Sequence, residues 1–64
     1  MKYKDVKINQ QVIDKDHQFD WGIGIVKKIL KTRVKINFQN IKDTVTYDIP
    51  HLQFLEPFNK VLNS

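Results

Sequence analysis

The sequence contains no cysteine and a single serine, Ser64. Without cysteine, disulfide bonds and thiolate zinc sites are excluded, and a lone serine at the last position is a poor candidate for a catalytic nucleophile. No stretch approaches the roughly 20 apolar residues of a membrane-spanning helix, and the opening MKYKDVKIN lacks the apolar run of a signal peptide. We therefore expect a cytoplasmic protein with no membrane partner.

Acidic residues are also few, since seven Asp and Glu stand against eleven Lys and Arg, a formal net charge of +4. This excess favours anionic partners such as nucleic acid or an acidic protein surface, although solubility alone explains it equally well. The 64 residues allow one domain. We expect that domain to span 1–64, with a core at about 8–57 and loose ends at 1–5 and 59–64.

The hydrophobic residues that are present repeat with period two, which indicates β-strands rather than helices. The clearest strands are expected at 33–38 and 44–49, joined by the polar connection 39–43. A further strand is expected at 23–30, where two adjacent apolar pairs flank Lys27 and Lys28. These pairs can share one buried face only if a β-bulge lies near residues 27–28.

Shorter elements are expected at both ends of this central region. Residues 11–14 form a fourth strand, with Val6 and Ile8 leading into it, and 15–20 form a long unpaired loop. Pro50 ends the 44–49 strand, 51–53 make one helical turn, and 54–56 form a last strand ended by Pro57. The predicted fold is all-β: a small five-stranded antiparallel SH3-like barrel with a single helical turn before the last strand.

Both glycines and the only tryptophan lie in the segment DWGIGIV, residues 20–26. A phosphate-binding loop would open directly into a helix, but the residues after Gly24 indicate a strand. We therefore interpret Gly22 and Gly24 as a bend at the entry to a strand, where a positive φ or a close backbone approach is needed. Trp21 is expected to cover one open end of the barrel.

The run V-x-D…DWGIGIV…VKINF…V-x-Y…L-x-F-L-E-P, from about residue 8 to 57, resembles the carboxy-terminal Tudor-like domain of the bacterial helicases PcrA and UvrD. It is similar also to small stand-alone bacterial domains of uncharacterised function with a DWGxGxV motif, and to the barrels of RapA and CarD-like proteins. The resemblance implies a Tudor-like fold and a protein partner such as RNA polymerase or a helicase. These families usually carry a glycine in the turn after V-x-F, and here 41–43 has none.

No enzyme activity, cofactor, metal or small-molecule substrate is expected. Asp14, Asp16 and His17 could suggest a metal site or an acid–base pair, but a site needs three converging ligands on rigid elements. A solvated cluster on a loop explains these three residues better.

Two surfaces are candidates for binding. The first is basic, on the central hairpin, and would track nucleic-acid phosphates or simply be a solvated face; it comprises Lys27, Lys28, Lys31, Arg33, Lys35 and Lys42. The second is formed by Phe19 and Trp21, which could anchor a protein or stack on bases beside the basic residues, or could pack over the barrel end. An aromatic cage of Phe19, Trp21 and Tyr47 is a weaker alternative, because Tyr47 alternates with core residues.

The resemblance implies a non-catalytic interaction module that docks on a protein of the bacterial transcription or DNA-repair machinery. Its contacts would come from Phe19 and Trp21 and from the basic hairpin. Sequence-independent binding of DNA or RNA through the same basic hairpin is the alternative function. A structural or dimerising barrel without a ligand is a third possibility.

Overall fold

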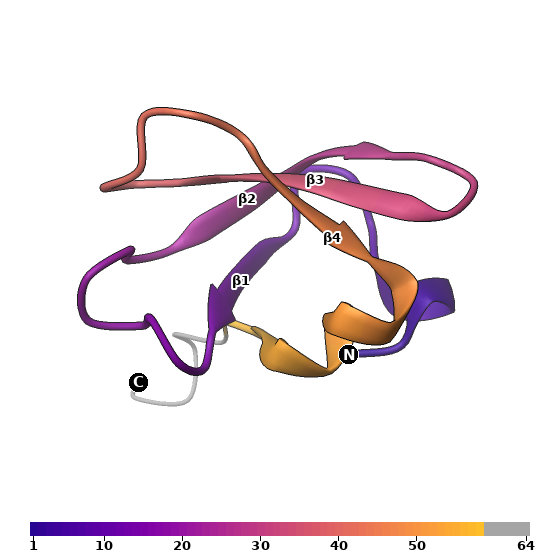
Figure 1. The fold of residues 1–64 in the computed structure, drawn as a ribbon, viewed down its shortest axis with the longest axis horizontal. Helices are drawn as coiled ribbons and strands as arrows, with labels where there is room; N and C mark the ends of the chain where they lie inside the picture. Colours follow the sequence, from indigo (N-terminus) through magenta and orange to yellow (C-terminus); the bar gives the residue numbers. More distant parts are fainter. Residues whose placement is uncertain (59–64) are drawn as a thin grey trace.

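The computed structural model describes residues 1–58, so the loose end expected at 59–64 lies outside the described part of the chain. In order, its elements are η1 (Tyr3–Asp5), β1 (Gln11–Asp14), β2 (Gly24–Ile29), β3 (Arg33–Phe38), β4 (Val45–Asp48), η2 (Ile49–Phe54) and β5 (Leu55–Pro57) (Figure 1). Both η elements are 3₁₀ helices. Within residues 1–58, no helix has the length and apolar character needed to cross a membrane.

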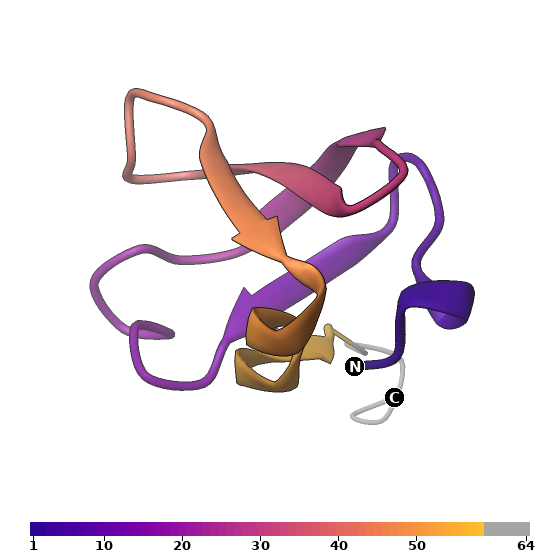
Figure 2. The same ribbon diagram turned by 45° about the vertical axis from the view of Figure 1, so that its right-hand side comes forward.

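The five strands form one antiparallel sheet in the order β4-β3-β2-β1-β5. This confirms the predicted strands, their antiparallel pairing and the helical turn before the last strand. The sheet curls, and η2 connects its two edge strands, β4 and β5 (Figure 2). No ladder joins those edges among the described residues, so the expected closure into a barrel is not observed.

The bulge expected in the second strand is present. Val26 pairs with Ile36 and Lys28 pairs with Lys35, so Lys27 is the extra residue in β2. Because of this extra residue, Val26 and Ile29 both face the core although they are three positions apart, and the two lysines are exposed.

Several boundaries of the carboxy-terminal elements differ from the predicted ones. Thr44 lies outside β4 and its hydroxyl donates to Asn37 Oδ1 at 2.8 Å. Ile49 and Pro50 begin η2, because the fixed φ of proline suits the first turn of a helix as well as the end of a strand. Pro57 pairs with Val12 inside β5, which an edge strand tolerates.

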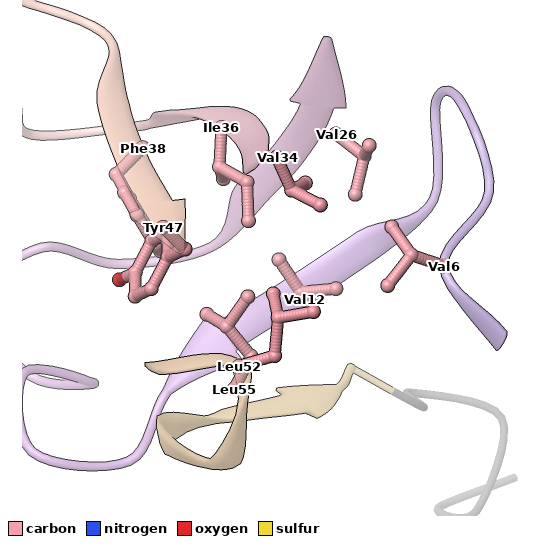
Figure 3. Packing of buried hydrophobic residues seen from close by; sticks show 9 residues of the cluster. All are labelled: Val6, Val12, Val26, Val34, Ile36, Phe38, Tyr47, Leu52 and Leu55. Atoms are coloured by element: carbon pink, nitrogen blue, oxygen red, sulfur yellow. The ribbon is translucent and has the colours of Figure 1, made fainter. Parts of the chain in front are cut away.

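The core lies between the β2–β3–β4 layer and the layer formed by β1, η2 and β5. Figure 3 shows its nine buried residues, which are Val6, Val12, Val26, Val34, Ile36, Phe38, Tyr47, Leu52 and Leu55. Their burial follows the alternation of the strands, in which every second residue of β3 is buried. Apolar area removed from water in this core is the main source of stability.

The amino-terminal residues, expected to be loose at 1–5, are instead held against the domain. The Tyr3 hydroxyl donates to the Leu30 carbonyl oxygen at 2.6 Å. The amino group of Met1 donates to the carbonyl oxygens of Leu52 and Leu55 at 2.9 and 3.2 Å. Ile8, expected to lead into the first strand, is 51% exposed before β1.

The two glycines meet the two needs expected of this segment: Gly22 adopts a positive φ, and Gly24 allows a close approach of neighbouring atoms. Gly22 has a φ of +77°, a left-handed conformation that side chains with a Cβ rarely adopt. Gly24 has no positive φ, but a Cβ there would lie 2.7 Å from both Ile36 Cγ2 and Phe38 Cε1. A strand, not a helix, follows Gly24, so the segment is not a phosphate-binding loop.

Asp14 is the one buried charged residue of the described chain, at 5% exposure. Its Oδ2 accepts a 2.6 Å hydrogen bond from the Tyr47 hydroxyl, and its Oδ1 accepts one from the Asp16 amide at 2.9 Å. Burial raises the pKa of the Tyr47 phenol, and the hydrogen bond to Asp14 and its negative charge raise that pKa further. The interpretation of Asp14 as part of a solvated cluster is therefore wrong.

Gly24→Ala is expected to lower the free energy of unfolding by about 1–3 kcal/mol, because the added methyl group would overlap packed core atoms. Urea denaturation measures the change. Phe38→Leu removes the ring that the methyl group would meet, so the double variant should lose less than the sum of the two single losses. Unchanged stability in Gly24→Ala would contradict the close packing described for this strand.

Tyr47 is expected to keep its proton in the folded state when the pH passes its ordinary pKa of about 10. Above pH ~10 the unfolded chain loses that proton and the folded chain keeps it. The free energy of unfolding therefore has its full value below pH ~10 and falls as the pH rises above it. In Tyr3→Phe, Tyr47 is the only tyrosine. Phenolate absorbance of that variant should therefore rise together with the loss of circular dichroism. A phenolate signal near pH ~10 with native dichroism would contradict the buried bond.

Candidate functional site

Five basic side chains lie on the β2–β3 hairpin and its turn, and we call them the basic face: Lys27, Lys28, Lys31, Arg33 and Lys35. Lys28 is the direct cross-strand partner of Lys35. Val34 and Ile36 are fully buried, and the alternation of β3 therefore directs Arg33 and Lys35 to the outer side of the sheet.

Little negative charge accompanies the basic face. From position 21 to position 42 the chain carries six basic residues and no Asp or Glu. Arg33 Nε lies 3.3 Å from Asp48 Oδ1 on the neighbouring strand, and both side chains are more than half exposed. An exposed pair of this kind contributes less than about 1 kcal/mol. Within residues 1–58, no other residue of the basic face forms an ion pair.

Lys42 does not belong to the basic face. It lies in the connection from β3 to β4, beyond the end of β3 opposite to Arg33. Each residue of a strand advances about 3.3 Å, so the length of β3 separates Lys42 from the hairpin turn. Figure 1 shows this connection and the β2–β3 turn on opposite sides of the molecule. The prediction that all six basic residues cluster together is therefore wrong for Lys42.

The segment 15–23, which joins β1 to β2, is the aromatic loop. It is folded into turns rather than unpaired: the His17 amide donates to the Asp14 carbonyl at 3.0 Å, and the Trp21 amide donates to the His17 carbonyl at 2.8 Å. The imidazole of His17 stacks on the indole of Trp21, with ring centroids 3.8 Å apart and planes 7° apart. His17 Nδ1 also lies 3.2 Å from Asp20 Oδ2.

The connection 39–44 holds the aromatic loop from its other side. The Asn40 amide donates to the Trp21 carbonyl at 3.0 Å, and Asn40 Nδ2 donates to the Asp20 carbonyl at 3.1 Å. The Ile23 amide donates to Gln39 Oε1 at 3.0 Å. Sequence reasoning missed Gln39 and Asn40, since nothing in a local pattern links them to residues 16 to 20 positions earlier.

The two aromatic residues of this loop differ in their surroundings. Trp21 is half-buried and packs against the core, with its ring centroid 5.2 Å from that of Phe38. Phe19 is 91% exposed. Tyr47 is buried in the core and bonded to Asp14, so it cannot supply the third ring of an aromatic cage.

The aromatic loop and the turn of the basic face lie at opposite ends of the sheet (Figures 1 and 2). Gly24, at the loop end of β2, pairs with Phe38, whereas Ile29, at the turn end, pairs with Val34. The expectation that Phe19 and Trp21 stand beside the basic residues is therefore wrong. The two candidate surfaces are separate sites.

The remaining candidates from the sequence do not form a chemical site. Asp14 is occupied by Tyr47 and by the Asp16 amide, and His17 is engaged with Trp21 and Asp20. Among residues 1–58, no group of three or more His, Cys, Asp or Glu could hold a metal ion, and no pocket is present.

Comparison with known proteins gives one family. Residues 9–49 match the model of a protein family of unknown function, DUF3553. No curated protein and no solved structure matches the chain. The matched segment runs from the residues before β1 to the end of β4, and it includes the aromatic loop, both glycines and the basic face. The chain belongs to the DUF3553 family.

Proposed function

We propose that this domain is a cytoplasmic, non-catalytic interaction module that docks through Phe19 on a protein of the bacterial transcription or DNA-repair machinery, such as RNA polymerase or a helicase. The observation that carries the proposal is the exposure of Phe19, 91%, on a loop whose backbone is fixed on both sides. Large aromatic side chains are typical anchors of protein interfaces, where each fills a pocket of the partner.

The ordering of the aromatic loop supports a binding role for Phe19. Asp20 and Trp21, which follow it, are bonded to Asn40, and the His17–Trp21 stack lies against Phe38. A loop that is already ordered loses little conformational entropy when it binds. An apolar side chain held in water by such a loop gains free energy when a partner covers it.

The class of partner rests on the resemblance described above. The order of the motifs is similar to that of the Tudor-like domain of PcrA and UvrD helicases, and the polymerase-facing barrels of RapA and CarD-like proteins are similar as well. A five-stranded antiparallel sheet with a helical turn before its last strand is compatible with a barrel of the SH3 or Tudor type. Because one fold can carry many functions, binding to the partner itself is the test.

Phe19→Ala is expected to weaken binding to core RNA polymerase or to a PcrA/UvrD-type helicase about tenfold or more, as truncation of an interface anchor does. Binding is measured with the partner immobilised and the domain in solution. The stability of the domain should not change, because the side chain is almost fully exposed.

Ile8→Ala is the matched control, since Ile8 is another exposed apolar side chain and lies outside the aromatic loop. It should bind like the unaltered domain. Equal weakening in both variants would show that binding depends on general hydrophobicity rather than on Phe19. Failure of the unaltered domain to bind polymerase or helicase would refute the proposed partners.

A further inference from the structure

We propose that the basic face binds the phosphate backbone of duplex nucleic acid, without reading its base sequence. This is a second binding site, at the opposite end of the sheet from Phe19, and it goes beyond the docking function proposed above. The site consists of the five basic residues of the hairpin and does not include Lys42.

The arrangement of charge on the basic face favours an anionic ligand. Lys28 and Lys35 are directly opposite each other on adjacent strands, so their Cβ atoms are about 5 Å apart, and like charges in this position are destabilising. The chain from 21 to 42 supplies no acid to neutralise them. A bound phosphate between the two ammonium groups would turn this repulsion into attraction, and displaced counterions would add to the affinity.

The spacing of the basic residues matches a row of phosphates. Arg33 and Lys35 are two positions apart on one face of β3, which separates them by about 6.6 Å, a distance similar to that between successive phosphates of a strand. The bulge at Lys27 places a further exposed cation next to Lys28. The hairpin therefore presents cations in two adjacent rows, which suits a chain of phosphates better than a single anion.

The residue types of the basic face favour nucleic acid over an acidic protein as the ligand. Four of the five residues are lysines. Lysine is depleted at protein–protein interfaces, where arginine and aromatic residues are enriched, whereas lysine and arginine both serve as phosphate ligands. The composition of the basic face thus favours a phosphate backbone over an acidic protein surface.

The surroundings of the basic face favour a duplex over a single strand. Proteins that bind single strands stack exposed aromatic rings on the bases. Phe19 and Trp21 lie at the other end of the sheet, and Tyr3, which reaches the hairpin at Leu30, packs against the core. With no free ring of the described chain beside the basic face, binding should depend on the density of phosphates, which is higher in a duplex.

The test is fluorescence anisotropy of a labelled DNA duplex with the 64-residue chain, titrated at salt concentrations between about 50 and 200 mM. Lys28→Gln and Lys35→Gln should each weaken binding several-fold and reduce the slope of log affinity against log salt by about 0.9 for each phosphate that the variant no longer neutralises. Both variants should be at least as stable as the unaltered chain, because each relieves the repulsion between the two lysines.

Lys42→Gln is the control, since it removes the same charge from an exposed lysine outside the basic face, and it should keep the slope of the unaltered domain. Phe19→Ala should also keep the full affinity for DNA, so failure of this inference and failure of the docking proposal can be told apart. The proposal is overturned if the duplex does not bind at low salt, or if Lys42→Gln weakens binding as much as Lys28→Gln does. Binding to polyglutamate or to phosphatidylglycerol vesicles as tight as to the duplex would also overturn it.

Discussion

The hydrogen bond between the Tyr47 hydroxyl and the Asp14 carboxylate joins two strands, β4 and β1, that do not pair with each other in the described chain. Tyr47 lies on β4, at one edge of the sheet, and Asp14 ends β1, which pairs with β2 and β5. In a curled sheet that hydrogen bonds do not close, this side-chain bond connects the two layers across the core. Burial of a carboxylate is costly unless it is hydrogen-bonded. An arrangement of the two layers that separated Asp14 from Tyr47 would therefore be disfavoured.

The same carboxylate begins the aromatic loop. While Oδ2 of Asp14 is held by Tyr47, its Oδ1 accepts the Asp16 amide and its carbonyl accepts the His17 amide. His17 then stacks on Trp21, which covers the core at Phe38. The position of the exposed ring at the loop tip is thus coupled to the interior of the domain through a short series of contacts. A substitution that breaks the Tyr47–Asp14 hydrogen bond would therefore also alter the conformation of the aromatic loop.

Much of this fold is predictable from local patterns. The ends of β3 are correct because strict alternation stops at turn-forming residues, and the bulge follows because Val26 and Ile29 cannot otherwise share a face. Local patterns do not predict an element boundary correctly where one residue type suits two kinds of structure. Pro50 can end a strand or begin a helix, and only the packing of η2 decides between them.

Two expectations about the candidate site were wrong, and they differ in whether the sequence could have corrected them. The burial of Asp14 depends on a hydroxyl 33 positions away, and no local pattern encodes a contact of that separation. The separation of Phe19 from the hairpin turn, in contrast, follows from connectivity. In a hairpin the loop before the first strand and the turn after it must lie at opposite ends, so the strands predicted at 23–30 and 33–38 already imply two distinct surfaces.

The bulge in β2 has a consequence for how chain length can vary at this point. Its extra residue, Lys27, is followed by an identical residue, Lys28. Loss of either codon would leave the same protein, with a regular ladder in which Val26, the remaining lysine and Ile29 keep their present partners. An insertion or deletion elsewhere in the strand would instead exchange its two faces. The two adjacent lysines therefore mark the place where this hairpin can lose a residue without changing which side chains form the core.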